Sequence, residues 1–140
     1  MSKIAVVYWS GTGNTEAMAN EVLAGAKGAG ADASLISASD FGSTLVSEYD
    51  AIAFGCPAMG AEELEDSEFA PMFEACEPGL KDKKIALFGS YGWGDGEWMR
   101  TWADRCREDG AVLACDFVIC ADAPDDDAKA ACRALGAALA

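Results

Sequence analysis

The sequence predicts a three-layer α/β domain in which helices cover both faces of a five-stranded parallel sheet. Strand-like apolar runs alternate with helix-like segments five times along the 140 residues, a pattern typical of doubly wound sheets built from βα units. No linker, repeat or low-complexity tract interrupts the alternation, so residues 1–140 are expected to form a single domain. Because 51% of the residues are hydrophobic, a chain of this length can fill a complete core.

The first half of the chain supplies three strands and two helices. Short runs of apolar residues predict the strands at 4–7, 33–36 and 51–56. Apolar residues at helical spacing predict a helix at about 14–27, on the evidence of Met18, Ala19, Val22 and Ala26. A shorter helix is expected at 41–49, marked by Leu45, Val46 and Tyr49.

The second half continues the same alternation. The strands expected there are 84–89 and 111–120. A helix at 67–77 is predicted by the i, i+3, i+4, i+7 spacing of Phe69, Met72, Phe73 and Cys76. A helix at 97–108 is expected to bury Trp98, Met99, Trp102 and Cys106. The closing helix is defined by Ala128, Ala131, Cys132, Leu135 and Leu139.

Three unusual loops follow strands of the predicted sheet, at 10–15, 57–66 and 90–96. In an open parallel sheet, ligands bind beyond the carboxyl ends of the strands, near the switch point of the strand order. The sequence therefore predicts that these three loops form one binding site.

The first loop has the composition of a phosphate cradle. It reads Ser10-Gly11-Thr12-Gly13-Asn14-Thr15 and opens a helix, where unpaired N–H groups and the helix dipole favour an anion. The loop contains no lysine, which a triphosphatase loop requires, and Glu16 stands where a dinucleotide fingerprint needs its third glycine. An ordinary helix cap in a βα turn is the alternative interpretation.

The other two loops carry large apolar side chains. The second includes Ala58-Met59-Gly60-Ala61-Glu62, and the third places Trp93 between two glycines in Ser90-Tyr91-Gly92-Trp93-Gly94. A methionine and a tryptophan at one end of a sheet can enclose a flat aromatic ligand. Ordinary core or surface packing of these two side chains is the alternative.

Charge and cysteine content narrow the classes of function. The net charge is −14, and the segment 28–80 contains eleven acidic residues and no Lys or Arg. Repulsion excludes nucleic acid as a partner, whereas a basic protein partner would be attracted. The six cysteines lack metal-site or Cys-x-x-Cys spacing and are expected to be buried apolar residues. With no signal-peptide pattern, the protein is expected in the cytoplasm.

Together, the three loops resemble the FMN-binding loops of flavodoxins, and the resemblance to the short-chain clostridial and Megasphaera-like type covers nearly the whole chain. It implies the flavodoxin-like strand order 2-1-3-4-5 and FMN as the cofactor. The FMN phosphate would be held by loop N–H groups and by Ser10, Thr12, Asn14 and Thr15, with Ser90 adding a hydroxyl. The cofactor-binding residues implied are Ser10, Gly11, Thr12, Gly13, Asn14, Thr15, Ala58, Met59, Gly60, Ala61, Glu62, Ser90, Tyr91, Gly92, Trp93 and Gly94.

The resemblance also implies roles around the flavin ring. Met59 would cover its inner face and Trp93 its outer face, while Glu62 would accept a hydrogen bond from flavin N3–H. The Gly60–Ala61 peptide would turn its carbonyl toward flavin N5. Backbone groups near Gly92 and Gly94 would serve the pyrimidine edge.

The function implied is low-potential, one-electron transfer on non-covalently bound FMN, cycling mainly between semiquinone and hydroquinone. The implied partners of this monomer are ferredoxin-type redox proteins, that is, reductases and oxidoreductases with basic docking patches. An FMN-dependent quinone reductase or nitroreductase-like enzyme is the main alternative. A receiver-type signalling module shares the topology, but it would need acids at the ends of the first and third strands, where the chain has Tyr8-Trp9 and Gly55-Cys56.

Overall fold

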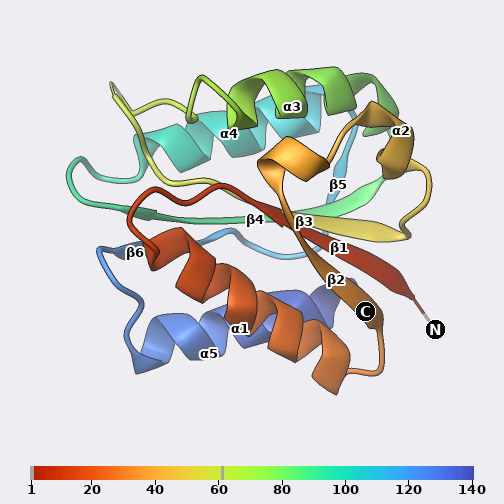
Figure 1. Ribbon diagram of the computed structural model, residues 1–140, viewed down its shortest axis with the longest axis horizontal. Helices are drawn as coiled ribbons and strands as arrows, with labels where there is room; N and C mark the ends of the chain where they lie inside the picture. Colours follow the sequence, from red (N-terminus) through yellow and green to blue (C-terminus); the bar gives the residue numbers. More distant parts are fainter. Residues whose placement is uncertain (1, 61) are drawn as a thin grey trace.

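The computed structural model describes residues 2–60 and 62–140, and it forms three layers around a parallel sheet (Figure 1). The strand order is β2-β1-β3-β4-β5, with β6 also paired to β4, which confirms the predicted fold. The strands are β1 (Lys3–Tyr8), β2 (Asp32–Ser37), β3 (Ala51–Gly55), β4 (Lys84–Tyr91), β5 (Val112–Leu113) and β6 (Val118–Ala121).

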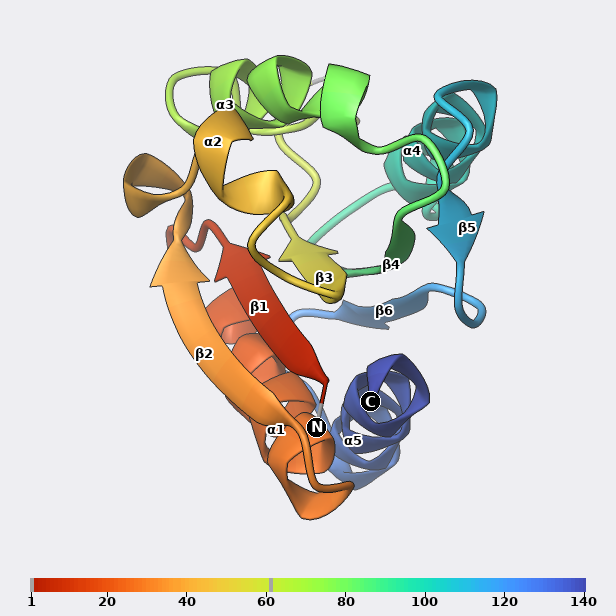
Figure 2. The ribbon, with the colours of Figure 1, turned by 90° about the vertical axis from the view of Figure 1, so that its right-hand side faces the viewer.

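Helices cover both faces of the sheet (Figure 2). One face carries α1 (Asn14–Gly28) and α5 (Asp126–Leu139), and the other carries α2 (Ser43–Val46), α3 (Phe69–Cys76) and α4 (Glu97–Glu108). Two short 3₁₀ helices, Ala38–Asp40 and Glu77–Gly79, lie among them. None of the helices in the described part of the chain combines the length and hydrophobicity needed to cross a bilayer.

Each face of the sheet has its own core. Under α3 and α4 the core is aromatic: Phe73 packs edge-on against Phe54 and Trp102, with ring centroids 5.2 and 5.5 Å apart, a favoured arrangement for aromatic pairs. Under α1 and α5 the core is mostly aliphatic, although it includes the buried ring of Phe88. There α1 and α5 approach closely, because a Cβ on Gly136 would lie 2.0 Å from the carbonyl oxygen of Val22.

The structure corrects several predicted boundaries. The strand expected at 84–89 continues to Tyr91, so the third loop begins after Tyr91. The strand expected at 111–120 is two short strands, β5 and β6. The helix expected at 41–49 spans only Ser43–Val46, after a 3₁₀ turn. Of the six thiols, Cys115 and Cys120 are half-buried rather than buried.

Candidate functional site

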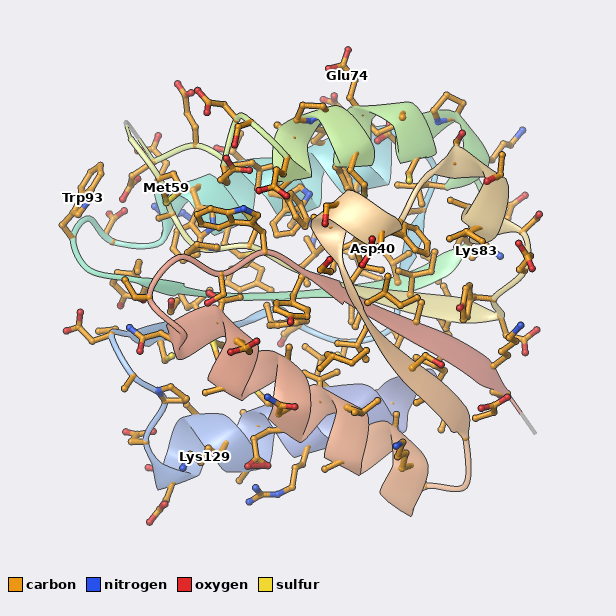
Figure 3. All side chains as sticks on the ribbon, viewed as in Figure 1. Asp40, Met59, Glu74, Lys83, Trp93 and Lys129 are labelled. Carbon is orange, nitrogen blue, oxygen red and sulfur yellow. The ribbon has the colours of Figure 1, made fainter. Side chains whose placement is uncertain are left out.

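The three loops meet at one edge of the sheet. Tyr8 at the end of β1 lies beside Gly55 at the end of β3, and Gly55 lies beside Phe88 of β4. Because the strands are parallel, the segments after them emerge on the same side. Met59 and Trp93 therefore lie at the same end of the molecule (Figure 3).

Internal hydrogen bonds shape the first loop. The Ser10 hydroxyl oxygen accepts from the N–H groups of Gly13 and Glu16, at 3.1 and 3.2 Å. The buried hydroxyl of Thr15 lies 3.1 Å from the hydroxyl of Ser90, which ties the first loop to the end of β4. Phosphate contacts from Ser10, Thr15 and Ser90 remain predictions, and these three hydroxyls already have protein partners.

The first loop also presents a set of unused donors. Within the described residues, the backbone N–H groups of Gly11, Thr12, Asn14 and Thr15 find no acceptor. They lie at the N-terminus of α1, the 15-residue helix Asn14–Gly28, where the helix dipole favours an anion. Gly13 adopts φ +95°, a left-handed conformation that glycine adopts without strain. These donors fit the single phosphate expected from the sequence.

A cavity of about 220 Å³ opens beside these donors. It brings the first loop together with the starts of the second and third loops. Its lining residues are Trp9, Gly11, Thr12, Asn14, Pro57, Ala58, Met59, Ser90, Tyr91, Gly92 and Asp122. The Trp9 ring packs over Gly11, where a Cβ would lie 3.1 Å from the indole.

A small hairpin forms the second loop. Met59 and Glu63 exchange two backbone hydrogen bonds of 2.8 Å, and Ala58 N–H donates to Ser90 O at 3.1 Å. Gly60 has φ +52° and Glu62 has φ +57°; a left-handed conformation costs a non-glycine residue about 1 kcal/mol or more. The predicted role of Ala61 lies outside the described residues.

The buried Glu65 carboxylate anchors the far end of this loop. It accepts hydrogen bonds of 2.8 Å from the N–H groups of Ser67, Glu68 and Phe69, which caps α3. Burial raises the pKa of Glu65, but these hydrogen bonds and one from the Ser67 hydroxyl outweigh it and hold the pKa below its ordinary value. Glu65 N–H donates to Cys56 Sγ at 3.4 Å, and burial raises the pKa of that thiol to about 12.

The third loop is held by charged groups. Asp95 N–H donates to Glu62 Oε1 at 3.1 Å, and Arg100 forms an ion pair of 3.0 Å with the Asp95 carboxylate. The carboxylates of Glu62, Asp95 and Glu97 offer oxygens that lie within 4.8 Å of one another. Gly94, at φ +82°, leaves the space that the Glu62 side chain occupies. Neither Asp95 nor Arg100 is among the site residues predicted from the sequence.

The two predicted ring-covering side chains are both solvent-exposed. Met59 is 38% exposed and lines the 220 Å³ cavity. Trp93 is 53% exposed and lines a separate open hollow together with Glu62 and Gly94. Large apolar side chains exposed beside a cavity are typical of a ligand site.

Sequence reasoning missed two lining residues, Trp9 and Asp122. Each directly follows a strand at the carboxyl edge of the sheet, β1 for Trp9 and β6 for Asp122. A position directly after a strand at that edge is the sequence signal that could have identified both residues.

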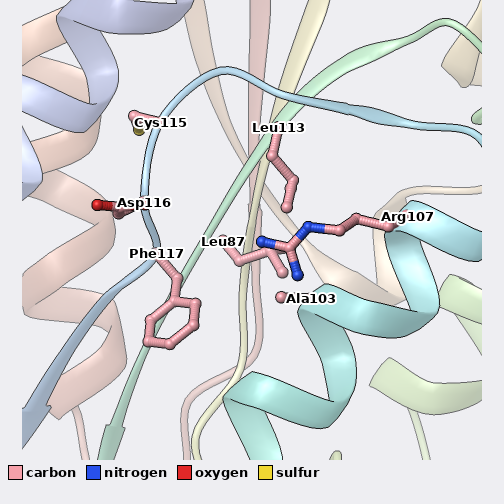
Figure 4. A pocket seen from close by; sticks show the side chains of 7 residues that line it. All are labelled: Leu87, Ala103, Arg107, Leu113, Cys115, Asp116 and Phe117. Carbon is pink, nitrogen blue, oxygen red and sulfur yellow. The ribbon is translucent and has the colours of Figure 1, made fainter.

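A second cavity, of about 260 Å³, lies between α4 and the β5–β6 connection, and none of the predicted site residues lines it (Figure 4).

Comparison with known proteins points to one family. The family model described as Flavodoxin matches residues 6–135. The chain is 49% identical to the flavodoxin of Megasphaera elsdenii over 98% of both chains, and 45% identical to that of Clostridium beijerinckii over 86% of this chain and 88% of the relative. The solution structure of two-electron reduced Megasphaera elsdenii flavodoxin matches with a TM-score of 0.89 over 97% of each chain.

Proposed function

The chain belongs to the flavodoxin family, whose members are FMN-binding electron-transfer proteins rather than enzymes, and on that premise we propose that it is a low-potential carrier of single electrons. The proposal depends most on the first loop, where four N–H groups find no acceptor among the described residues and three of them belong to residues that line the 220 Å³ cavity. When bound, FMN supplies reversible one-electron chemistry, and the protein sets its affinity and potentials.

The phosphate of FMN would be held by neutral donors only. The backbone N–H groups of Gly11, Thr12, Asn14 and Thr15 and the side chains of Thr12 and Asn14 would supply these donors, whereas the Gly13 N–H is already donated to the Ser10 hydroxyl. The Thr15 and Ser90 hydroxyls, 3.1 Å apart, would hold this loop against the end of β4. The dipole of α1 would stabilise a phosphate dianion bound there, although no cationic side chain pairs with it.

The flavin ring would lie between Met59 and Trp93, with the Glu62 carboxylate toward its N3–H. The ring would cover apolar surface that is otherwise exposed on both side chains, which favours binding. The Gly60–Ala61 peptide is proposed to face flavin N5. Gly60, at φ +52°, provides backbone freedom on one side of that peptide.

Negative charge around the ring supports a low potential for the second electron. The Glu62, Asp95 and Glu97 carboxylates crowd within 4.8 Å of one another, and Arg100 is already paired with Asp95. Adding a further negative charge beside this cluster is unfavourable. We therefore propose that the protein cycles mainly between the one-electron-reduced and the fully reduced flavin.

Flavodoxins act with redox partner proteins. We propose that ferredoxin-type reductases and oxidoreductases dock basic patches against the acidic surface of a monomeric carrier, in small, salt-sensitive contacts. We also propose a cytoplasmic setting, where its six thiols would stay reduced.

Purification followed by anaerobic redox titration tests the proposal. The protein is expected to be yellow, to contain one FMN per chain, and to take up two electrons in separate steps, the second at lower potential. Neutralising Glu97, a member of that carboxylate cluster, with Gln should raise the potential of the second step by an amount that shrinks at high salt. Asp32→Asn, at the opposite end of the sheet, is the matched control. A chain that takes up no flavin contradicts the proposal.

A further inference from the structure

We propose that the 260 Å³ cavity between α4 and the β5–β6 connection binds a small apolar carboxylate. The apolar body of the ligand would fill the cavity, and its carboxylate would pair with the Arg107 guanidinium. Binding there would be independent of the proposed function, because this cavity shares no lining residue with the 220 Å³ cavity at the three loops.

Apolar side chains form most of the wall of the 260 Å³ cavity. Leu87 of β4 and Ala103 of α4 are each 1% exposed, whereas Leu113 and Phe117 are only half-buried. An apolar ligand would cover surface on Leu113 and Phe117 that otherwise faces water, which favours binding. An apolar cavity of about 150 Å³ can hold a benzene ring, so a cavity of about 260 Å³ leaves room for a ring with a short carboxylate arm.

Arg107 is the one cationic side chain among the lining residues. Figure 4 shows its guanidinium reaching toward Leu113 and Leu87, whereas the Asp116 side chain points to the far side of its segment. The guanidinium donates one hydrogen bond, to Asp104 Oδ1 at 3.0 Å, and it has no other acceptor among the described residues. Its remaining N–H groups are free to bind a carboxylate in the bidentate geometry that arginine favours.

The segment between β5 and β6 offers further donors. Ala114 N–H donates to Ile85 O at 2.9 Å, but within the described chain the N–H groups of Cys115, Asp116 and Phe117 find no acceptor. All three of these residues line the cavity. The Cys115 thiol adds no negative charge at neutral pH, because burial, followed by the charge of Asp116, raises its pKa. Uncommitted donors and one cation beside apolar walls suit an anion with an apolar body.

An NMR titration of the full chain, as purified, with sodium phenylacetate at constant ionic strength tests the inference. The amide signals of residues 103–107 and 113–117 should shift and reach saturation, with a dissociation constant on the order of 1 mM for so small a ligand. Phenylacetamide has the same shape without the charge. It should bind about fivefold more weakly, a modest factor because the Arg107 side chain is 60% exposed.

Three variants show whether Arg107 recognises the carboxylate. Arg107→Gln should weaken phenylacetate binding about fivefold and leave phenylacetamide binding nearly unchanged, so that the two ligands bind alike. Arg133→Gln is the matched control, because Arg133 is also exposed and ion-paired, with Glu21 at 2.8 Å, but lies on α5. Asp104→Asn removes the competing carboxylate from Arg107 and should tighten phenylacetate binding about twofold.

Three results would overturn the inference. One is the absence of saturable shifts at 103–107 and 113–117 with about 10 mM phenylacetate, well above the expected dissociation constant. Another is equal affinity of the native protein for phenylacetate and phenylacetamide. The third is a loss of phenylacetate affinity in Arg133→Gln as large as that in Arg107→Gln. Each of these results leaves the proposed function standing, which only a failure of the native protein to bind FMN would contradict.

Discussion

Asp109, at the C-terminal end of α4, is placed where its ionisation should weaken the fold. Its Oδ2 is buried without a hydrogen-bond partner among the described residues. Arg105 is committed to Glu77, its Nε donating to Glu77 Oε2 at 2.8 Å. Burial, followed by the neighbouring Glu77 carboxylate, raises the pKa of Asp109 to about 6. The C-terminal helix dipole also disfavours a negative charge there.

The sign of the pH dependence follows from this raised pKa. The pKa of Asp109 is about 6 in the folded state and 3.8 as an ordinary side chain, so its proton is bound more tightly in the folded chain. Its stabilising contribution is complete below the unfolded pKa and is lost as the pH rises through 6. When the pH falls from 8 to 5, the free energy of unfolding rises by the equivalent of about one pK unit, which is ~1.4 kcal/mol. Screening of the partly exposed side chain reduces this toward ~1 kcal/mol.

The variant Asp109→Asn replaces the carboxyl with an amide, which stays neutral beside Glu77 at every pH. We expect it to exceed the native protein in unfolding free energy at pH 8, and this advantage to shrink by about 1 kcal/mol at pH 5. Urea unfolding at both pH values, at one salt and one FMN concentration, measures the difference. Asp104→Asn, on the exposed face of the same helix, is the control. An advantage of the same size at both pH values would refute the reasoning.

Three other outcomes are expected. Glu65→Ala should lower the unfolding free energy by about 1–3 kcal/mol at pH 7, because three N–H groups lose their acceptor; a change no larger than that of Glu63→Ala would contradict the capping role. Gly94→Ala should weaken FMN binding about fivefold in a fluorescence titration, because a Cβ there would displace the Glu62 carboxylate that is proposed to face flavin N3–H, a loss of about 1 kcal/mol; unchanged affinity would contradict that role of Glu62. Burial raises the pKa of the Cys56, Cys106 and Cys132 thiols to about 12. Iodoacetamide at pH 8 should therefore alkylate these three thiols negligibly in the folded chain and readily once urea unfolds it.

The layered fold was predictable because local patterns and tertiary packing agree. The strand at 51–56 is a continuous apolar run, and β3 is buried on both faces. Helical spacing at 97–108 predicted that Trp98 and Trp102 are buried, and each is 2% exposed. Both patterns reflect which side chains face the core, so they carry over from sequence to structure.

The division of the last strand could not be predicted from the sequence. Residues 111–120 form an almost continuous apolar run, broken only by Asp116. Ile85 of β4 pairs with Leu113 of β5, and Phe88 of β4 pairs with Val118 of β6. The two paired positions are three residues apart along β4 but five residues apart along the edge segment. The two surplus residues loop out of the ladder, as in a bulge. Pairing register depends on the neighbouring strand, and local composition does not record it.

The site was predictable in its loops but not in all of its contacts. The glycines and hydroxyls of 10–15 indicate a phosphate loop, and the structure provides the unpaired donors there. The sequence could not show that the Ser10 hydroxyl is used to cap the loop, because that depends on backbone geometry. Trp9 and Asp122 were missed because they belong to no short motif and are brought to the cavity only by the strand order.

Because of the surplus residues beside β4, the segment 114–117 is a suitable site for inserting a foreign sequence. The edge strand already leaves and rejoins its neighbour there, and the side chains are half-exposed or exposed. Lengthening such an excursion adds little closure entropy. A binding peptide or reporter spliced between β5 and β6 should therefore leave the electron-carrying end of the molecule intact, and a tethered partner could be presented from the flank of the sheet.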